Sequence, residues 1–438
     1  MKKFLAGAAK VNITPPVGAP LSGYTVRKDV SQGIHDDLYA KALVLDNGEK
    51  VLAIVTTDLL GFYDNFVDKV RNLIKKQTGI DKNNILISAT HTHSAPDTLY
   101  GLYSQGRSSD SWMDVLAQKI AGCVYMAWRN RKEARIGTGK GSVQIGVNRR
   151  NPDGKPIDPE VGVLRVDDIE GNLMAVVINY TCHAVVLGPD NLLISADYPG
   201  YTMRMIEKLK GENVVAMFTN GAEGDINTGH SADISGIGGC IPGRTFERAE
   251  KLGNILGGEV LKVLEQIKVS PKVHLDVKKK IVELPLKTLP SLEEAEKELK
   301  KKASTLNKLK KASREEITRA KIEKFYAEIT LSMVREIEDL GLRKTMKAEI
   351  QAMRLNDTIL IAFPGELFVE IGLEIKKDSD FKNTFIVGLA NGEIGYIPTH
   401  QAFVEGGYES ISTKFTGEAE NIIKDTVLKL IKEIRRVS

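Results

Sequence analysis

Apolar runs of strand length recur along this chain of 438 residues, each followed by a polar or glycine-rich turn and then by a helical pattern. The runs span residues 51–57, 84–90, 173–181, 213–219, 358–363 and 384–389. Helical periodicity occupies residues 63–77, 198–209 and 247–267 between them. Strands that are apolar on both faces must be covered on both sides. We therefore predict an α/β fold in which mixed β-sheets are flanked by helices.

Residues 291–340 differ in character from the rest of the chain. Ser291 with Glu294, and Ser313 with Glu316, each fit the capping box that starts a helix. Apolar residues follow at helical spacing, at Leu292, Ala295, Leu299, Leu306 and Leu309, and at Ile322, Phe325, Ile329, Met333 and Ile337. We predict an antiparallel helical hairpin inserted into one domain made of residues 1–290 and 341–438. A packed surface insertion is favoured over a lid or a dimer arm.

Charge and cysteine content narrow the class of protein. The net charge is +4, from 61 basic and 57 acidic residues, which gives no field strong enough to indicate nucleic acid. No apolar run approaches the ~18 residues of a membrane span. The three cysteines, Cys123, Cys182 and Cys240, argue against a disulfide framework and for a reducing compartment. We predict a cytoplasmic protein with no nucleic-acid partner and no membrane span, and a homo-oligomer stays open.

Metal-ligand and proton-transfer residue types stand where the apolar runs end. In open α/β sheets, ligand sites gather at the carboxyl ends of strands. The residues in question are Asp58, His91 and His93, His183 within its run, Asp225, and Glu366. This placement predicts a site built from distant parts of the chain.

Two histidines and a glutamate predict a zinc site. His91 and His93 point to the same face of an extended chain, so one can bind a metal while the other handles protons, or both can bind. His183, taken alone, is more typical of a core histidine, and Glu366 of a carboxylate at a helix start. Together, two histidines and a carboxylate form the shell typical of hydrolytic zinc. We predict a zinc hydrolase with ligands His91, His183 and Glu366, and with His93 positioned for proton transfer.

Short motifs over nearly the whole chain, except the helical insertion, carry a family resemblance. They are GAAKVNITPP at 7–16, GIHDDLYAKA at 33–42, SATHTHSAP at 88–96, NRR at 148–150, YTCHA at 180–184, ISADYPG at 194–200, GDIN at 224–227, PGE at 364–366 and GYIPT at 395–399. With these motifs the chain resembles the catalytic domain of the neutral (non-lysosomal) ceramidases, zinc amidases that cleave the N-acyl bond of ceramide.

The resemblance implies a role for individual residues. One zinc ion per chain would be bound by His91, His183, Glu366 and Tyr396. The implied catalytic residues are His93 as the acid/base group, Arg149 as an oxyanion contact, Tyr408 as a second tyrosine of the site, and Asp225. His35 falls in a family motif near the site, with its role open.

Departures from the family pattern bear on the substrate. Asn227 stands where the family has a serine, and Ala95 where it has a glycine. The chain ends too soon after Tyr396 for the family's C-terminal immunoglobulin-like domain, and no secretion signal precedes it. We therefore expect a ceramidase-like mechanism in lipid metabolism, on a small-molecule or lipid-like amide other than membrane ceramide.

Two other functions fit the same residues. The metal site could act on an ester, a lactone or a cyclic amide, because a polarised carbonyl serves either substrate and pocket shape decides. The fold could also belong to a binding protein without turnover, although His93 argues against that. A serine hydrolase is disfavoured because no G-x-S-x-G motif is present. Iron or manganese would also suit this ligand shell.

Overall fold

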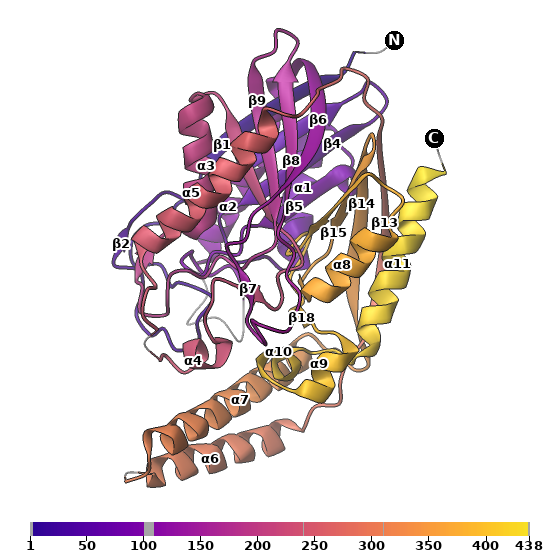
Figure 1. The fold of residues 1–438 in the computed structure, drawn as a ribbon. Helices are drawn as coiled ribbons and strands as arrows, with labels where there is room; N and C mark the ends of the chain where they lie inside the picture. Colours follow the sequence, from indigo (N-terminus) through magenta and orange to yellow (C-terminus); the bar gives the residue numbers. More distant parts are fainter. Residues whose placement is uncertain (1–2, 100–108, 240, 310, 437–438) are drawn as a thin grey trace.

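Two β-sheets stacked face to face form the centre of this computed structural model, which describes residues 3–99, 109–239, 241–309 and 311–436 (Figure 1). The strands of the larger sheet are β1 (Leu5–Asn12), β3 (Tyr39–Asp46), β4 (Val51–Thr57), β5 (Ile85–Ala89), β6 (Lys132–Ser142), β8 (Glu160–Asp168), β9 (Leu173–Tyr180) and β11 (Val215–Asn220). Within the described ranges their order is β11-β9-β8-β6-β1-β3-β4-β5. The smaller sheet consists of β13 (Leu275–Pro285), β14 (Thr345–Leu355), β15 (Thr358–Ala362) and β17 (Asn383–Val387), in that order.

Helices cover the outer face of each sheet. The larger sheet is covered by α1 (Asp64–Thr78), α2 (Asp110–Arg129), α3 (Asp197–Lys210) and α5 (Phe246–Leu264). The smaller sheet is covered by α8 (Val369–Asp378) and α11 (Glu418–Arg435). The molecule is therefore built in four layers, with the two sheets inside.

Strand β3 shows why the apolar runs are continuous. Ala42 and Val44 pack beneath α1 and α2, whereas Leu43 and Leu45 point the other way, into the core between the sheets. Alternate residues of a strand face opposite sides, so a strand between two covered faces needs apolar residues at every position.

The predicted α/β fold with mixed sheets is confirmed. The pairs β4–β5, β9–β11 and β15–β17 are parallel, whereas β1–β3, β6–β8 and β13–β14 are antiparallel. The parallel strands are the ones that the apolar runs indicated, and each predicted run overlaps its strand. The division of the chain into domains stays a prediction.

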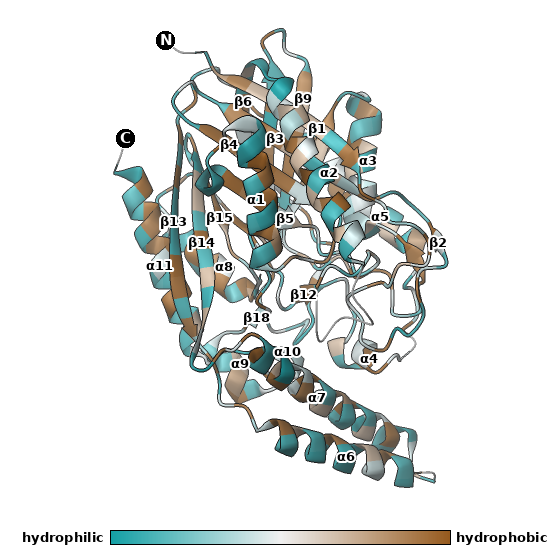
Figure 2. Cartoon of the chain, turned by 180° about the vertical axis from the view of Figure 1, so that it is seen from behind, coloured by the Kyte–Doolittle hydropathy of each residue, from teal (hydrophilic) through white to brown (hydrophobic). Residues whose placement is uncertain are grey.

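The predicted helical hairpin is present as α6 (Leu292–Lys308) and α7 (Arg314–Asp339), and it projects from the body beside α10 (Tyr408–Ser412) in both views (Figures 1 and 2). Ser291 and Ser313 form the two predicted capping boxes. The second apolar stripe does not face α6: Phe325, Ile329 and Met333 pack against the body, with Tyr408 and Ile411. Helix α6 instead packs on Leu331 and Val334, which lie on another face of α7.

Two further predictions from the sequence concern the cysteines and membrane spans. Cys123 and Cys182 are buried and free, and Cys240 lies outside the described residues. In the described part of the chain, no helix combines the length and the apolar character that crossing a bilayer requires.

Candidate active site

The carboxyl ends of strands from both sheets meet at one place. The segment that follows β17 is joined by backbone hydrogen bonds to the ends of β11 and β5. Gly388 N–H donates to Asn220 O of β11 (3.0 Å), and Ala89 N–H of β5 donates to Leu389 O (3.2 Å). Strand β5 leads there into His91, and β9 leads into His183. Because parallel strands end at the same edge, residues far apart in the sequence come together there.

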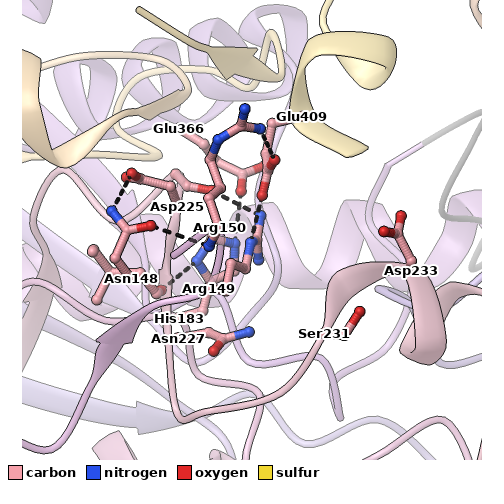
Figure 3. Close-up of polar contacts among 12 residues, drawn as sticks. Asn148, Arg149, Arg150, His183, Asp225, Asn227, Ser231, Asp233, Glu366 and Glu409 are labelled. Carbon is pink, nitrogen blue, oxygen red and sulfur yellow. Dashed lines mark hydrogen bonds and ion pairs between the residues drawn. The ribbon is translucent and has the colours of Figure 1, made fainter. Parts of the chain in front are cut away.

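His91, His183 and Glu366 form a buried cluster that could hold a metal ion. One potential ligand atom from each residue lies within 4.8 Å of the others. Oε2 of Glu366 is 2.8 Å from Nε2 of His183 and 3.6 Å from Nε2 of His91. All three predicted ligands are therefore brought together (Figure 3 shows His183 and Glu366).

The hydrogen bonds of the two imidazoles fix which nitrogen is free. Nδ1 of His91 lies 2.8 Å from Leu60 O, and Nδ1 of His183 lies 2.7 Å from Glu223 O. A carbonyl only accepts, so each Nδ1 carries a hydrogen, and Nε2 is the nitrogen left to face Glu366 and to bind a cation. Metal-binding histidines are typically held in this way by their second nitrogen.

The protonation preferences of the cluster show that it attracts positive charge. Burial lowers the pKa of His183 to about 4, so this ring is neutral and directs a lone pair at the Glu366 carboxylate. Burial also opposes a charge on His91, but the Glu366 carboxylate outweighs burial and raises the pKa of His91 to about 9. The donor set and its electrostatics therefore fit a divalent cation.

Tyr396, predicted as a fourth ligand, lies beside the cluster. It belongs to β18 (Tyr396–Ile397), which pairs in parallel with β16 (Glu366–Leu367) so that Tyr396 stands opposite Glu366. Its ring stacks on that of His183 with the centroids 6.4 Å apart. Burial and then the Glu366 charge hold the pKa of Tyr396 well above 10.

His93 stands next to the cluster without being part of it. Its ring centroid is 4.9 Å from that of His91, and the two Nε2 atoms are 3.3 Å apart. Among the described residues, Nδ1 of His93 has no hydrogen-bond partner, although it is buried. Burial, and then the charge of His91, hold the pKa of His93 well below 6.5.

Arg149 is fixed in place by a shared carboxylate. Its Nε donates to Oε1 of Glu409 (2.7 Å), and Nη1 of Arg150 donates to Oε2 of the same residue (2.8 Å), as Figure 3 shows. A second bond joins Nη2 of Arg149 to Gly224 O (2.8 Å). Burial opposes the charge, but Tyr396 and Glu409 raise the pKa of Arg149 well above its usual value, so the cation persists.

A small pocket opens over these residues. It is lined by Gly23, Tyr24, Thr25, His93, Arg149, His183, Val185, Asn227, His230, Ala232, Ser235, Gly236, Arg244, Phe325, Tyr396 and Tyr408. The space within it that the centre of a water molecule can reach is about 50 Å³. The predicted residues His93, Arg149 and Tyr408 therefore share one pocket with His183 of the cluster and with Tyr396, and Phe325 of α7 lines the same pocket.

Two residues from the sequence analysis do not line this pocket. The Asp225 carboxylate accepts hydrogen bonds from Val369 N–H (2.9 Å) and from the Asn148 amide (2.6 Å), which ties α8 to the loop that carries Arg149. His35 stacks on Phe246 with ring centroids 3.7 Å apart, outside the pocket lining. Asp225 thus positions its neighbours.

The sequence analysis assigned no role to two carboxyl groups beside the cluster. Glu223 is fully buried, and neither of its carboxylate oxygens has a hydrogen-bond partner among the described residues. Burial raises the pKa of Glu223 well above 4.5 and that of Glu393 to about 8, and the Glu366 charge adds to both shifts. Glu223 follows a buried strand, and this is the same sequence pattern from which Asp225 was predicted as a site residue. No comparable pattern surrounds Glu393 in the sequence.

The fold and the sequence agree with those of known ceramidases. The crystal structure of neutral ceramidase from Pseudomonas aeruginosa superposes with a TM-score of 0.76 at 19% identity, covering 100% of this chain and 75% of that one. Neutral ceramidase of Drosophila melanogaster is 28% identical over 314 residues, which are 60% of this chain and 44% of that protein. Neutral ceramidase A of Dictyostelium discoideum is 27% identical over 256 residues, 51% of this chain and 36% of that protein.

These curated relatives are much longer proteins, and this chain spans less than half of their length. The sequence profile of the family described as "Neutral/alkaline non-lysosomal ceramidase, N-terminal" matches residues 4–236, which is more than half of the chain and includes His91, His93, Arg149 and His183. On this match the chain belongs to the neutral/alkaline non-lysosomal ceramidase family.

Proposed function

We propose that this protein is a zinc-dependent hydrolase that cleaves an N-acyl amide bond in a compact, lipid-like or other small-molecule substrate. The observation that carries the proposal is the convergence of two histidine lone pairs and a carboxylate oxygen, with each Nδ1 tied to a backbone carbonyl. Family membership supports amide hydrolysis, because the curated relatives are named neutral ceramidases.

His91, His183 and Glu366 would hold the ion, and Tyr396 would be the fourth ligand. When bound, zinc lowers the pKa of a water molecule and polarises a carbonyl group. His93 lines the pocket, and its Nε2 lies 3.3 Å from Nε2 of His91, so it is placed to take a proton from the nucleophile and deliver it to the leaving nitrogen. Arg149 presents a fixed cation, and its guanidinium carbon lies 5.8 Å from the centroid of the Tyr408 ring. Both side chains would stabilise a developing oxyanion.

The size of the pocket supports a compact substrate. The space that the centre of a water molecule can reach in it is only about 50 Å³, which supports a short acyl group over a long one. Its lining mixes polar side chains with the apolar groups of Phe325, Val185 and Ala232. We therefore propose a short amide over membrane ceramide, in a cytoplasmic setting.

The small pocket also favours a second candidate, hydrolysis of an ester, a lactone or a cyclic amide. The same ion and the same Arg149 cation would serve such a carbonyl. A binding protein without turnover is disfavoured because His93 lies in the pocket beside the candidate ligands, and a proton-transfer group at that place serves turnover rather than binding.

The test combines metal content with turnover. Wild-type protein and the His93→Ala and His183→Ala variants are supplied with zinc and assayed on matched short-chain amides and esters. We expect about one zinc per chain in the wild type and in His93→Ala, a marked loss in His183→Ala, and turnover reduced at least ~100-fold in His93→Ala. Wild-type protein that takes up no zinc at neutral pH overturns the proposal, and zinc without turnover of any amide or ester favours the binding protein.

A further inference from the structure

His230 lines the pocket, and one of its ring nitrogens has no hydrogen-bond partner among the described residues. Its Nε2 lies 2.7 Å from Val185 O, and since a carbonyl only accepts, Nε2 carries the hydrogen. In the neutral ring Nδ1 is then an acceptor, and it has no partner among the described residues although His230 is only 7% exposed. An unpaired buried acceptor is unfavourable, which is a reason to look for a ligand that pairs with it.

The surroundings keep this acceptor free and neutral. Burial lowers the pKa of His230 to about 3, and the nearby Arg244, Arg248 and Arg149 add to the shift. Asn227 cannot turn to Nδ1, because its amide donates to His230 O (2.8 Å) and its oxygen accepts from Gly229 N–H (2.9 Å). The donors of Arg244 are bonded to Ser235 Oγ, to Tyr24 and to backbone carbonyls. The lone pair of His230 is therefore left unused by the described residues around it, in a side chain that lines the pocket.

We propose that His230 is a specificity-determining residue, whose Nδ1 accepts a hydrogen bond from a neutral hydroxyl or amide N–H group of the substrate. This inference rests on the proposed hydrolase function and names a feature of its substrate. The arginines around His230 disfavour an ammonium group at the same place, because like charges repel. A site built around a buried acceptor rejects an analogue that lacks the donor, because the acceptor is then left unpaired.

The experiment uses three amides that differ at one position: a free hydroxyl, its methyl ether, and an ammonium group. The value of kcat/KM is measured for zinc-loaded wild type and for two variants. His230→Phe keeps a ring of similar shape without an acceptor, and His230→Asn places an amide oxygen near the position of Nδ1. Metal content is measured in all three proteins.

We expect the wild type to prefer the hydroxyl compound over the ether by roughly 10- to 100-fold, and to act least on the ammonium compound. His230→Phe should reduce the preference for hydroxyl over ether to about twofold with activity on the ether retained, and His230→Asn should restore part of it. A role in packing alone would lower activity on the two compounds equally.

The inference is overturned if the wild type treats hydroxyl and ether alike, which needs no variant to fold. It is also overturned if His230→Phe, with its zinc intact, keeps the wild-type preference. If the wild type hydrolyses none of the compounds, the proposed function fails, and binding of the same compounds measured by calorimetry still decides the role of His230. Equal affinities for hydroxyl and ether would then reject it.

Discussion

Nε2 of His183 lies 2.8 Å from Oε2 of Glu366, and both atoms are buried acceptors. His183 has its hydrogen on Nδ1, where it donates to Glu223 O, and burial keeps the ring neutral. Two lone pairs at this distance repel each other unless a positive charge lies between or beside them. The fold therefore brings the two residues together at a cost in free energy that a cation bound there would offset.

Removing the metal should lower the thermal stability of the protein. An ion present at ~100 times its dissociation constant stabilises a fold by about 2.7 kcal/mol, which corresponds to a few degrees in Tm for a protein of this size. We expect a strong chelator to lower the Tm of the wild type and to leave His183→Ala unchanged. Replacing the exposed His274 by alanine is the matched control, and it should respond like the wild type. A His183→Ala variant that still loses stability on chelation would contradict the assigned ligand set.

Gly23 should be essential to the placement of His93. It has φ +95°, and a Cβ added there would lie 2.4 Å from Nδ1 of His93. Gly18 has nearly the same φ, +94°, with no neighbouring atom within 4 Å. Both alanine substitutions carry a backbone strain of about 1 kcal/mol, but only Gly23→Ala displaces the imidazole. We expect kcat to fall about 100-fold in Gly23→Ala and less than about threefold in Gly18→Ala, with zinc retained in both. Equal kcat values in the two variants would refute this.

Phe325 should set the size of substrate that the pocket accepts. Its ring stacks on Tyr408 with centroids 6.0 Å apart and lines the pocket. We expect Phe325→Ala to lower kcat/KM for a short amide about tenfold and to raise the relative rate on a longer acyl chain, because the wall is removed. Leu331→Ala is the control: Leu331 is also buried on α7, but it packs within the hairpin. It should lower stability by about 2–5 kcal/mol and leave the chain-length preference unchanged.

Ionisation of the buried Asp58 should lower the stability of the fold as the pH rises. Burial raises its pKa from 3.8 to about 6, with the carboxylate accepting from Tyr39 N–H at 2.9 Å. The folded state then binds the proton more tightly than the unfolded chain does. Stability is lost as the pH rises from about 4 to above 6, by about 3 kcal/mol in total.

The measurement for Asp58 is the free energy of unfolding in denaturant at pH 4 and pH 8, with chelator present throughout. Asp58→Asn keeps an oxygen for Tyr39 N–H and cannot ionise, so its stability relative to the wild type should increase by about 3 kcal/mol between the two pH values. The control is Asp68→Asn, because Asp68 is exposed, and its stability relative to the wild type should be the same at both pH values. If the free energies of unfolding of Asp58→Asn and the wild type differ by the same amount at both pH values, the Asp58 side chain is not held in the buried state described.

Much of the fold could be predicted from the sequence because it depends on local patterns. The strands that the apolar runs indicated are buried between two layers, and the capping boxes at Ser291 and Ser313 start both helices of the hairpin. The antiparallel strands were harder to detect. For example, only two of the eleven residues of β6 are buried and three are glycines, which weakens the apolar signal.

The candidate site was partly predictable for a similar reason. His91, His183 and Glu366 follow or lie in apolar segments. Their residue types and their places at strand ends together predicted a common site, and the structure places them together. Glu393, His230 and Gly23 gave no such signal, since their surroundings depend on loops that meet only in the folded chain. Asp225 has the residue type and position of a site residue, yet its carboxylate is occupied by Val369 N–H and Asn148.

The hairpin interrupts the connection between β13 and β14, two strands that pair along their whole length, from Leu275 with Leu355 to Pro285 with Thr345. The ligand cluster comes from strand ends in the body, whereas one wall of the pocket comes from this insertion. The candidate ligands and this wall of the pocket are thus encoded in separable parts of the gene. Changes of length or sequence within 291–340 offer evolution, and protein engineers, a route to reshape that wall while leaving the three residues that could hold an ion intact.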